Sequence, residues 1–198
     1  GTGFPGQIRI TYKIATTTTI SCGAGPFTFI GAAQTPCTAT VTAPDGLNQS
    51  VTVNYSSNTN AGTASASASL VATANYLASS ANTTFTIDKA ATTTAVTCGA
   101  GPFTYTGSAQ TPCSATVTGP GLSLTPAVSY SNNTNAGTAV ASYSYAGAAN
   151  YLTSSDNKSF TINKANPTLS VSNSPATYNG TAKTATVTGS TAGTVNNI

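Results

Sequence analysis

The chain has 198 residues, a formal net charge of +3 and only 5% charged residues. Charged residues make up about 25% of an average globular protein, so neutral polar side chains must cover most of this surface. The six basic residues form no run, which excludes a nucleic-acid or membrane-surface footprint. No apolar stretch approaches the roughly 20 residues of a membrane-spanning helix. Nine Tyr, six Phe and many Val, Thr and Ile favour strands over disorder, so an all-β fold is expected.

The cysteines are even in number and the chain contains no histidine. They do not form a C-x-x-C pair, which argues against a metal centre and for disulfides. Disulfides in turn indicate an oxidising, extracellular location. The cysteines are Cys22, Cys37, Cys98 and Cys113.

Residues 1–14 precede the first complete unit of the sequence. Within them, Ile8–Lys13 approximately matches Phe85–Lys89, which closes the following unit. We therefore interpret residues 1–14 as the closing-type strand of a preceding unit, or as a strand donated to another chain.

An internal duplication is the strongest signal in the sequence. Cys22–Phe27 returns unchanged as Cys98–Phe103, 76 residues further along. Asn58–Ala64 returns as Asn133–Ala139, now at a spacing of 75. A period of this length is too long for a solenoid repeat and fits independent small domains in tandem.

Each duplicated unit shows the period-two alternation of half-buried strands. Apolar residues alternate with Thr, Ser or Asn along Cys37–Val41, Val51–Tyr55 and Ala64–Leu70, and Phe85–Ile87 closes the unit. Gly62 and its counterpart Gly137 mark turns that need positive φ. The pattern predicts tandem immunoglobulin-like antiparallel β-sandwich domains. The expected domains are repeat 1 at 15–89, repeat 2 at 90–164 and a partial repeat 3 at 165–198.

The duplication also predicts how the cysteines pair. We expect Cys22–Cys37 and Cys98–Cys113, one disulfide inside each complete unit. The partial third unit lacks cysteine at both corresponding places, near Ser172 and Lys183. Loss of both residues together is what a bonded pair predicts. Closing a loop of about 15 residues stabilises a fold by roughly 3 kcal/mol in the chain-entropy model, and a 75-residue domain with a core of small side chains needs such support.

The repeated unit resembles the MBG-type bacterial immunoglobulin-like repeats. The resemblance rests on packing and turn residues, with Phe29 of the first unit in place of Tyr105. The residues that carry the resemblance are Tyr105–Cys113, Val128–Asn132, Asn135–Ala139, Tyr145–Gly147, Asn150–Tyr151 and Phe160–Lys164. The resemblance implies a long, secreted, multi-domain surface protein of a bacterium that serves as an adhesin or a stalk.

Residues for chemistry are scarce. The only acids are Asp45, Asp88 and Asp156, and Asp88 is replaced by Asn163 in the second unit. Without histidine there is no Ser-His-Asp arrangement, and dispersed carboxylates supply neither a glycosidase pair nor a calcium site. We therefore expect no catalytic, cofactor or metal site, and no enzyme activity.

Lys13, Lys89 and Lys164 recur at the unit junctions. An isopeptide bond to Asn is one interpretation, but no acid recurs beside the lysines to promote it. A solvated charge at each junction is the interpretation we favour.

Three functions remain open from the sequence. The first is a spacer or stalk of a bacterial surface protein, whose partners are the flanking repeats of a longer chain. The second is a self-polymerising filament subunit, joined head to tail by strand complementation between the partial C-terminal repeat and the N-terminal strand of the next copy. The third is a binding module for glycan or ice through exposed Thr, Asn and Tyr; its ligand is unknown.

Overall fold

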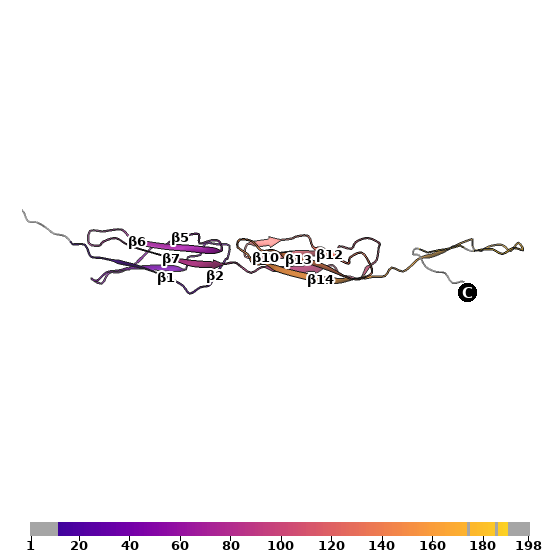
Figure 1. The fold of residues 1–198 in the computed structure, drawn as a ribbon, viewed down its shortest axis with the longest axis horizontal. Coiled ribbons are helices and arrows are strands. Elements are labelled where there is room, and N and C mark those ends of the chain that lie inside the picture. Colours follow the sequence, from indigo (N-terminus) through magenta and orange to yellow (C-terminus); the bar gives the residue numbers. More distant parts are fainter. Residues whose placement is uncertain (1–11, 174, 185, 190–198) are drawn as a thin grey trace, which may run out of the picture. The chain divides into compact units, whose positions relative to one another are not determined.

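A computed structural model describes residues 12–173, 175–184 and 186–189. These residues form strands and no helix, which confirms the predicted all-β fold (Figure 1). We call strands β1–β7 repeat 1 and strands β8–β14 repeat 2; β15 and β16 form a separate hairpin. The two repeats have the same sequence of strands, as the duplication predicts.

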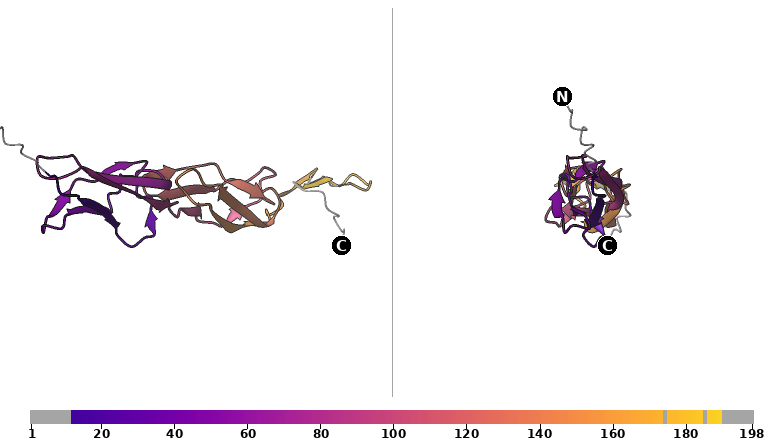
Figure 2. Two further views of the ribbon diagram at one scale, coloured as in Figure 1. Left: turned by 60° about the vertical axis from the view of Figure 1, so that its left-hand side comes forward. Right: turned by 90° about the vertical axis from the view of Figure 1, so that its left-hand side faces the viewer.

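Repeat 1 is a sandwich of a three-stranded and a four-stranded sheet. Strands of the first sheet contact strands of the second, and Figure 2 shows the two layers. In the first sheet the order is β1 (Thr17–Cys22), β3 (Cys37–Thr42) and β4 (Asn48–Val51). In the second it is β2 (Phe27–Thr28), β7 (Ser79–Asp88), β6 (Gly62–Leu70) and β5 (Asn54–Ser56). The short β2 runs parallel to β7, and the other neighbouring strand pairs of repeat 1 are antiparallel.

Small residues make up much of the core of repeat 1. Along β6, Ala64, Ala66 and Ala68 are at most 2% exposed and alternate with serines that point outward. Ile87 on β7 and Val41 on β3 are the largest fully buried side chains. An alanine removes little apolar area from water, so these few large residues and the aromatic rings supply much of the hydrophobic stabilisation.

Repeat 2 repeats this arrangement strand for strand. One sheet has the order β11 (Leu122–Leu124), β10 (Cys113–Gly119) and β8 (Thr93–Cys98). The other has the order β12 (Ser129–Ser131), β13 (Gly137–Tyr145), β14 (Ser154–Asn163) and β9 (Phe103–Thr104). Its largest fully buried side chains, Val117 and Ile162, are the duplicates of Val41 and Ile87.

One predicted strand is divided in the structure. The alternation from Val51 to Tyr55 predicts one strand, but β4 ends at Val51 and β5 begins at Asn54. The two strands belong to different sheets. Both sheets turn their apolar face to the same core. The alternation of inward-facing and outward-facing residues therefore continues where the chain passes from one sheet to the other. Periodicity alone cannot reveal this change of sheet. In contrast, Gly62 and Gly137 have the positive φ that their turns predicted, +136° and +140°.

Beyond repeat 2, the described part of the chain forms one antiparallel hairpin. Its strands are β15 (Leu169–Ser172) and β16 (Thr186–Gly189). Leu169 and Val171 on β15 are 68% and 55% exposed. The predicted closing or donor strand at Ile8–Lys13 lies outside the described residues, except for its last two positions.

Contacts between Cα atoms divide the chain into two compact units. The first unit contains Gly1–Ala95, Ala115–Ala127 and Tyr143–Asp156. The second contains Val96–Ser114, Val128–Ser142 and Asn157–Ile198. The first unit thus contains all of repeat 1 and one end of repeat 2, which includes β11 and parts of β8, β10, β13 and β14. The contacts between repeat 1 and this end of repeat 2 are internal to the first unit.

Candidate functional site

Each repeat contains the disulfide that the sequence predicts. Cys22 on β1 lies directly opposite Cys37 on β3 in the strand register, and their sulfurs are bonded. Cys98 and Cys113 are bonded in the same way in repeat 2, so no cysteine is free. Each bond closes a sequence separation of 15 residues. Such bonds are typical of proteins from an oxidising, extracellular environment.

A tyrosine fixes the backbone at the second cysteine of each pair. The Tyr55 hydroxyl accepts a hydrogen bond from the Cys37 amide at 2.8 Å and donates one to the Cys37 carbonyl at 2.9 Å. Tyr130 makes the same two bonds to Cys113, at 2.8 and 2.9 Å. The ring of Tyr55 also packs edge-to-face on Phe85, with ring centroids 6.2 Å apart. One side chain therefore connects the disulfide to the opposite sheet.

Replacing this hydroxyl is expected to weaken the repeat. Tyr55→Phe keeps the ring but leaves the Cys37 amide and carbonyl without their partner, which should cost repeat 1 about 1–2 kcal/mol. Hydrogen exchange measured by mass spectrometry on β3 peptides under native conditions gives this loss as faster exchange. Tyr12→Phe is the matched control, because Tyr12 is 84% exposed. Equal exchange in Tyr55→Phe and the wild type would contradict the assigned role.

Strand-like hydrogen bonds continue through the connection between the repeats. β7 ends at Asp88 and β8 begins at Thr93. Between them, the Ala90 amide donates to the Asn150 carbonyl at 2.9 Å, and the Ala90 carbonyl accepts from the Leu152 amide at 2.8 Å. Ala90 is 1% exposed. A boundary between independent domains is usually an exposed, flexible linker, whereas this connection is buried and hydrogen-bonded at Ala90.

Tyr151 packs against the core of repeat 1. Its ring meets Phe29 edge-to-face, with centroids 5.4 Å apart, and it contacts the buried cluster that includes Phe29 and Ala90. Its hydroxyl donates to the Pro120 carbonyl at 2.6 Å. Edge-to-face aromatic pairs contribute about 0.5–1.5 kcal/mol beyond the area they bury. Tyr151 thereby links the turns of repeat 2 to the hydrophobic core of repeat 1.

Asn150 adds directional hydrogen bonds to the same contact. Its Oδ1 accepts from the Ala61 amide at 2.9 Å, and its Nδ2 donates to Asn60 Oδ1 at 3.0 Å. Gly31 lies beside this contact, since a Cβ at Gly31 would be 4.0 Å from the Pro120 carbonyl oxygen. We call this set of contacts the junction; it is formed by Phe29, Gly31, Asn60, Ala61, Lys89, Ala90, Pro120 and Ala148–Leu152.

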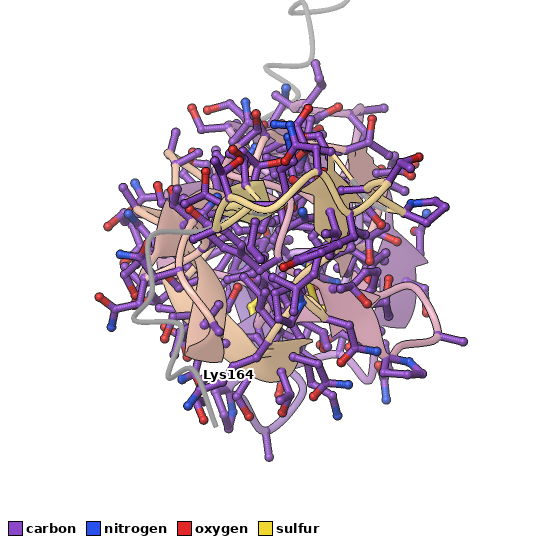
Figure 3. All side chains as sticks on the ribbon, turned by 90° about the vertical axis from the view of Figure 1, so that its right-hand side faces the viewer. Lys164 is labelled. Carbon is purple, nitrogen blue, oxygen red and sulfur yellow. A yellow bond between two sulfur atoms is a disulfide. The ribbon has the colours of Figure 1, made fainter. Side chains whose placement is uncertain are left out.

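Lys89 takes part in the junction as a hydrogen-bond donor. Its Nζ donates to the Ala148 carbonyl at 2.9 Å, and the side chain is exposed. This contact fits the interpretation of Lys89 as a solvated junction charge better than an isopeptide bond to Asn. The duplicate Lys164 is exposed where it follows β14 (Figure 3).

The duplicate of the Asn150–Tyr151 pair has a different environment. In repeat 1 the hydroxyl of Tyr76 donates to Asp45 Oδ2 at 2.7 Å instead of to a proline carbonyl. This hydrogen bond, followed by partial desolvation and the negative charge of Asp45, raises the pKa of Tyr76 above its ordinary value. The hydrogen bond to Asp45 therefore favours the protonated form of the Tyr76 hydroxyl.

Two grooves of the described surface contain little reactive chemistry. One groove, of about 480 Å³, lies on repeat 1 and is lined by threonine, serine and apolar side chains together with Tyr55 and Cys37. Another, of about 320 Å³, adjoins Cys98 and Lys158. Across the described ranges, no three His, Cys, Asp or Glu side chains gather where they could hold a metal ion. In the same part of the chain, no helix has the length and hydropathy needed to cross a membrane.

Comparison of the sequence with protein-family models finds no match, and comparison with curated proteins finds none.

Proposed function

We propose that the chain is a spacer segment of a secreted bacterial surface protein, in which successive β-sandwich repeats are joined stiffly through the junction. The resemblance to MBG-type repeats supports this proposal, and so do the disulfides. The grooves described above contain hydroxyl and apolar groups rather than paired acids or a nucleophile with its base. A structural role fits this inventory better than catalysis.

The observation that carries the proposal is the hydrogen-bonded, buried connection at Ala90. A spacer that sets reach must resist bending where its domains meet. The bonds from Ala90 to Asn150 and Leu152 fix the backbone, and the contacts of Tyr151 and Asn150 fix the side chains. These interactions replace the mobile linker that would let two domains move independently.

Asn150→Ala tests the junction directly. The substitution removes the acceptor of the Ala61 amide, so we expect the Ala61 amide to exchange with solvent about tenfold faster or more, the equivalent of about 1.4 kcal/mol. Hydrogen exchange followed by NMR measures this amide individually. The strands of both repeats should keep their protection, because Asn150 lies in a turn.

Asn75→Ala is the matched control, since Asn75 is the duplicate of Asn150 and is exposed. It should leave the exchange of Ala61 unchanged. Unchanged exchange of Ala61 in Asn150→Ala would mean that the junction does not persist in solution, and the stiff spacer would lose its basis.

A second candidate is a filament subunit assembled by strand complementation. The observation that favours it is the hairpin of β15 and β16, on which Leu169 and Val171 are exposed and which has no third strand among the described residues. An added strand could satisfy such edges and cover these side chains. Negative-stain electron microscopy of the full chain and of a variant lacking residues 1–11, which keeps Ile14 and its hydrogen bonds to Asn75 and Leu77, tests it. Filaments formed only by the full chain would support it, whereas particles of one-chain size from both would exclude it.

A further inference from the structure

The duplication gives each repeat both halves of the junction. One half is the end surface, formed by Phe29, Gly31, Asn60 and Ala61 in repeat 1 and by Tyr105, Gly107, Asn135 and Ala136 in repeat 2. The other half is the docking loop, Ala74–Leu77 in repeat 1 and Ala149–Leu152 in repeat 2. Within the chain, the end surface of repeat 1 holds the docking loop of repeat 2. Among the described residues, the end surface of repeat 2 and the docking loop of repeat 1 make no such contact.

The end surface of repeat 2 is exposed where its duplicate is covered. Phe29 is 6% exposed beneath Tyr151, whereas Tyr105 is 38% exposed. Ala61 is half-buried by Asn150, whereas Ala136 is exposed. Gly31 and Gly107 share a φ of +79°, so the two surfaces share this left-handed glycine position. Among the described residues, the side chains of Tyr105 and Asn135 have no hydrogen-bond or ring partner.

The docking loop of repeat 1 already has the conformation of its docked duplicate. The Ile14 amide donates to the Asn75 carbonyl at 2.8 Å and the Leu77 amide to the Ile14 carbonyl at 2.8 Å, as Ala90 does with Asn150 and Leu152. The Thr73 amide donates to the Tyr76 carbonyl at 3.1 Å, the same distance as from Ala148 to Tyr151. The side chain of Asn75 is exposed and has no partner among the described residues. Because the loop is preformed, docking it requires little ordering.

Opposite charges lie beside the two uncovered halves. Lys164 is the duplicate of Lys89, which donates to the Ala148 carbonyl immediately before the docking loop of repeat 2. Asp45 lies against the docking loop of repeat 1, where it accepts the hydrogen bond of Tyr76. Both Lys164 and Asp45 are exposed. Complementary charges of this kind favour a specific register between two surfaces.

We propose that the end surface of repeat 2 binds the docking loop of repeat 1 from a second copy of this chain. Asn75 takes the place of Asn150 and bonds the Ala136 amide and Asn135, while Tyr76 packs on Tyr105. The contact repeats the junction without a covalent connection, and because its two halves differ it joins copies head to tail. It needs no exchange of strands, and it rests on the proposed function, because it uses the same two halves through which successive repeats are joined.

Sedimentation velocity of the full chain over a range of concentrations tests the proposal. The wild type should self-associate, and Asn75→Ala and Tyr105→Ala should each weaken the association constant about tenfold. The first removes two hydrogen bonds and the second removes the aromatic contact. Asn82→Ala is the matched control, because Asn82 is exposed on β7 away from both halves; it should associate like the wild type.

A charge exchange gives a result that loss of folding cannot imitate. Lys164→Asp and Asp45→Lys should each self-associate more weakly than the wild type, because each places like charges on the two halves. Mixed together, the two variants should recover association, since the introduced carboxylate of one copy then faces the introduced ammonium group of the other.

A wild type that stays monomeric up to millimolar concentration would overturn the proposal, as would association that neither Asn75→Ala nor Tyr105→Ala weakens. A mixture that fails to recover association would overturn it as well. If association instead requires residues 1–11 and is unchanged by Asn75→Ala and by Tyr105→Ala, the copies are joined by strand exchange. None of these results depends on the exchange of the Ala61 amide, which tests the spacer separately.

Discussion

Cys22→Ala combined with Cys37→Ala is expected to lower the free energy of unfolding of repeat 1 by about 3 kcal/mol. The bond closes a sequence separation of 15 residues, and the chain-entropy model assigns roughly this stabilisation to a loop of that size. For a domain of 60–100 residues, about 1 kcal/mol corresponds to a shift of roughly 4–8 °C in Tm, so the loss should amount to roughly 12–24 °C. Differential scanning calorimetry at neutral pH measures the shift.

The loss should be severe because little else stabilises repeat 1. Its β6 contributes alanines to the core, and small cores leave a domain of this size marginal. Cys98→Ala with Cys113→Ala provides a control within the same chain. Hydrogen exchange should show the first double variant losing protection mainly in β1–β7 and the second mainly in β8–β14. A shift in Tm smaller than about 3 °C for either double variant would contradict this account of the stability.

Ile87→Ala is expected to cost repeat 1 about 2–5 kcal/mol, the range for removing most of a buried isoleucine. Ile87 is 1% exposed on β7. Its neighbours in the strand register are Gly62 on β6 and Phe27 on β2. Ala64 and Ala66 belong to the same buried cluster, and their short side chains cannot fill the space, so the cavity should persist and the cost should fall toward the upper end of the range.

Urea unfolding followed by circular dichroism measures the cost of Ile87→Ala. Ile30→Ala is the matched control, because Ile30 is 58% exposed and should change the stability by no more than about 0.5 kcal/mol. Ile162→Ala should act on repeat 2 as Ile87→Ala acts on repeat 1. Similar losses for Ile87→Ala and Ile30→Ala would mean that the core is not packed as described.

Most of the fold follows from the sequence because the signals are local and occur twice. The alternation along Cys37–Val41 and along Ala64–Leu70 corresponds to β3 and β6, with the apolar faces buried. The pairing of Cys22 with Cys37 followed from the partial third repeat. The division between β4 and β5 could not be predicted, because a strand that changes sheets within one sandwich keeps its period. In repeat 2 the corresponding stretch contains Pro126, which disfavours a continuous central strand and was a signal for this division.

The contacts of the candidate site were harder to predict. Tyr55 and Tyr130 follow the second cysteine of their repeats by 18 and 17 residues. The sequence therefore shows that these two tyrosines occupy corresponding positions. Their hydrogen bonds to the cysteine backbone depend on how two sheets face each other, which no local pattern encodes. The pair Asn150–Tyr151 was recognised as part of the duplication. Its role in the junction was not, because a repeated motif does not show which copy contacts a neighbour.

The proposed spacer function requires the junction to hold the two repeats as one stiff segment. Residual dipolar couplings of backbone amides in weakly aligned solution test it most directly. Couplings from β1–β7 and from β8–β14 are fitted separately to an alignment tensor. The account predicts that the two fits give the same tensor, in magnitude, rhombicity and orientation. Two tensors of clearly different magnitude would show that the repeats reorient independently, and would contradict the proposed function.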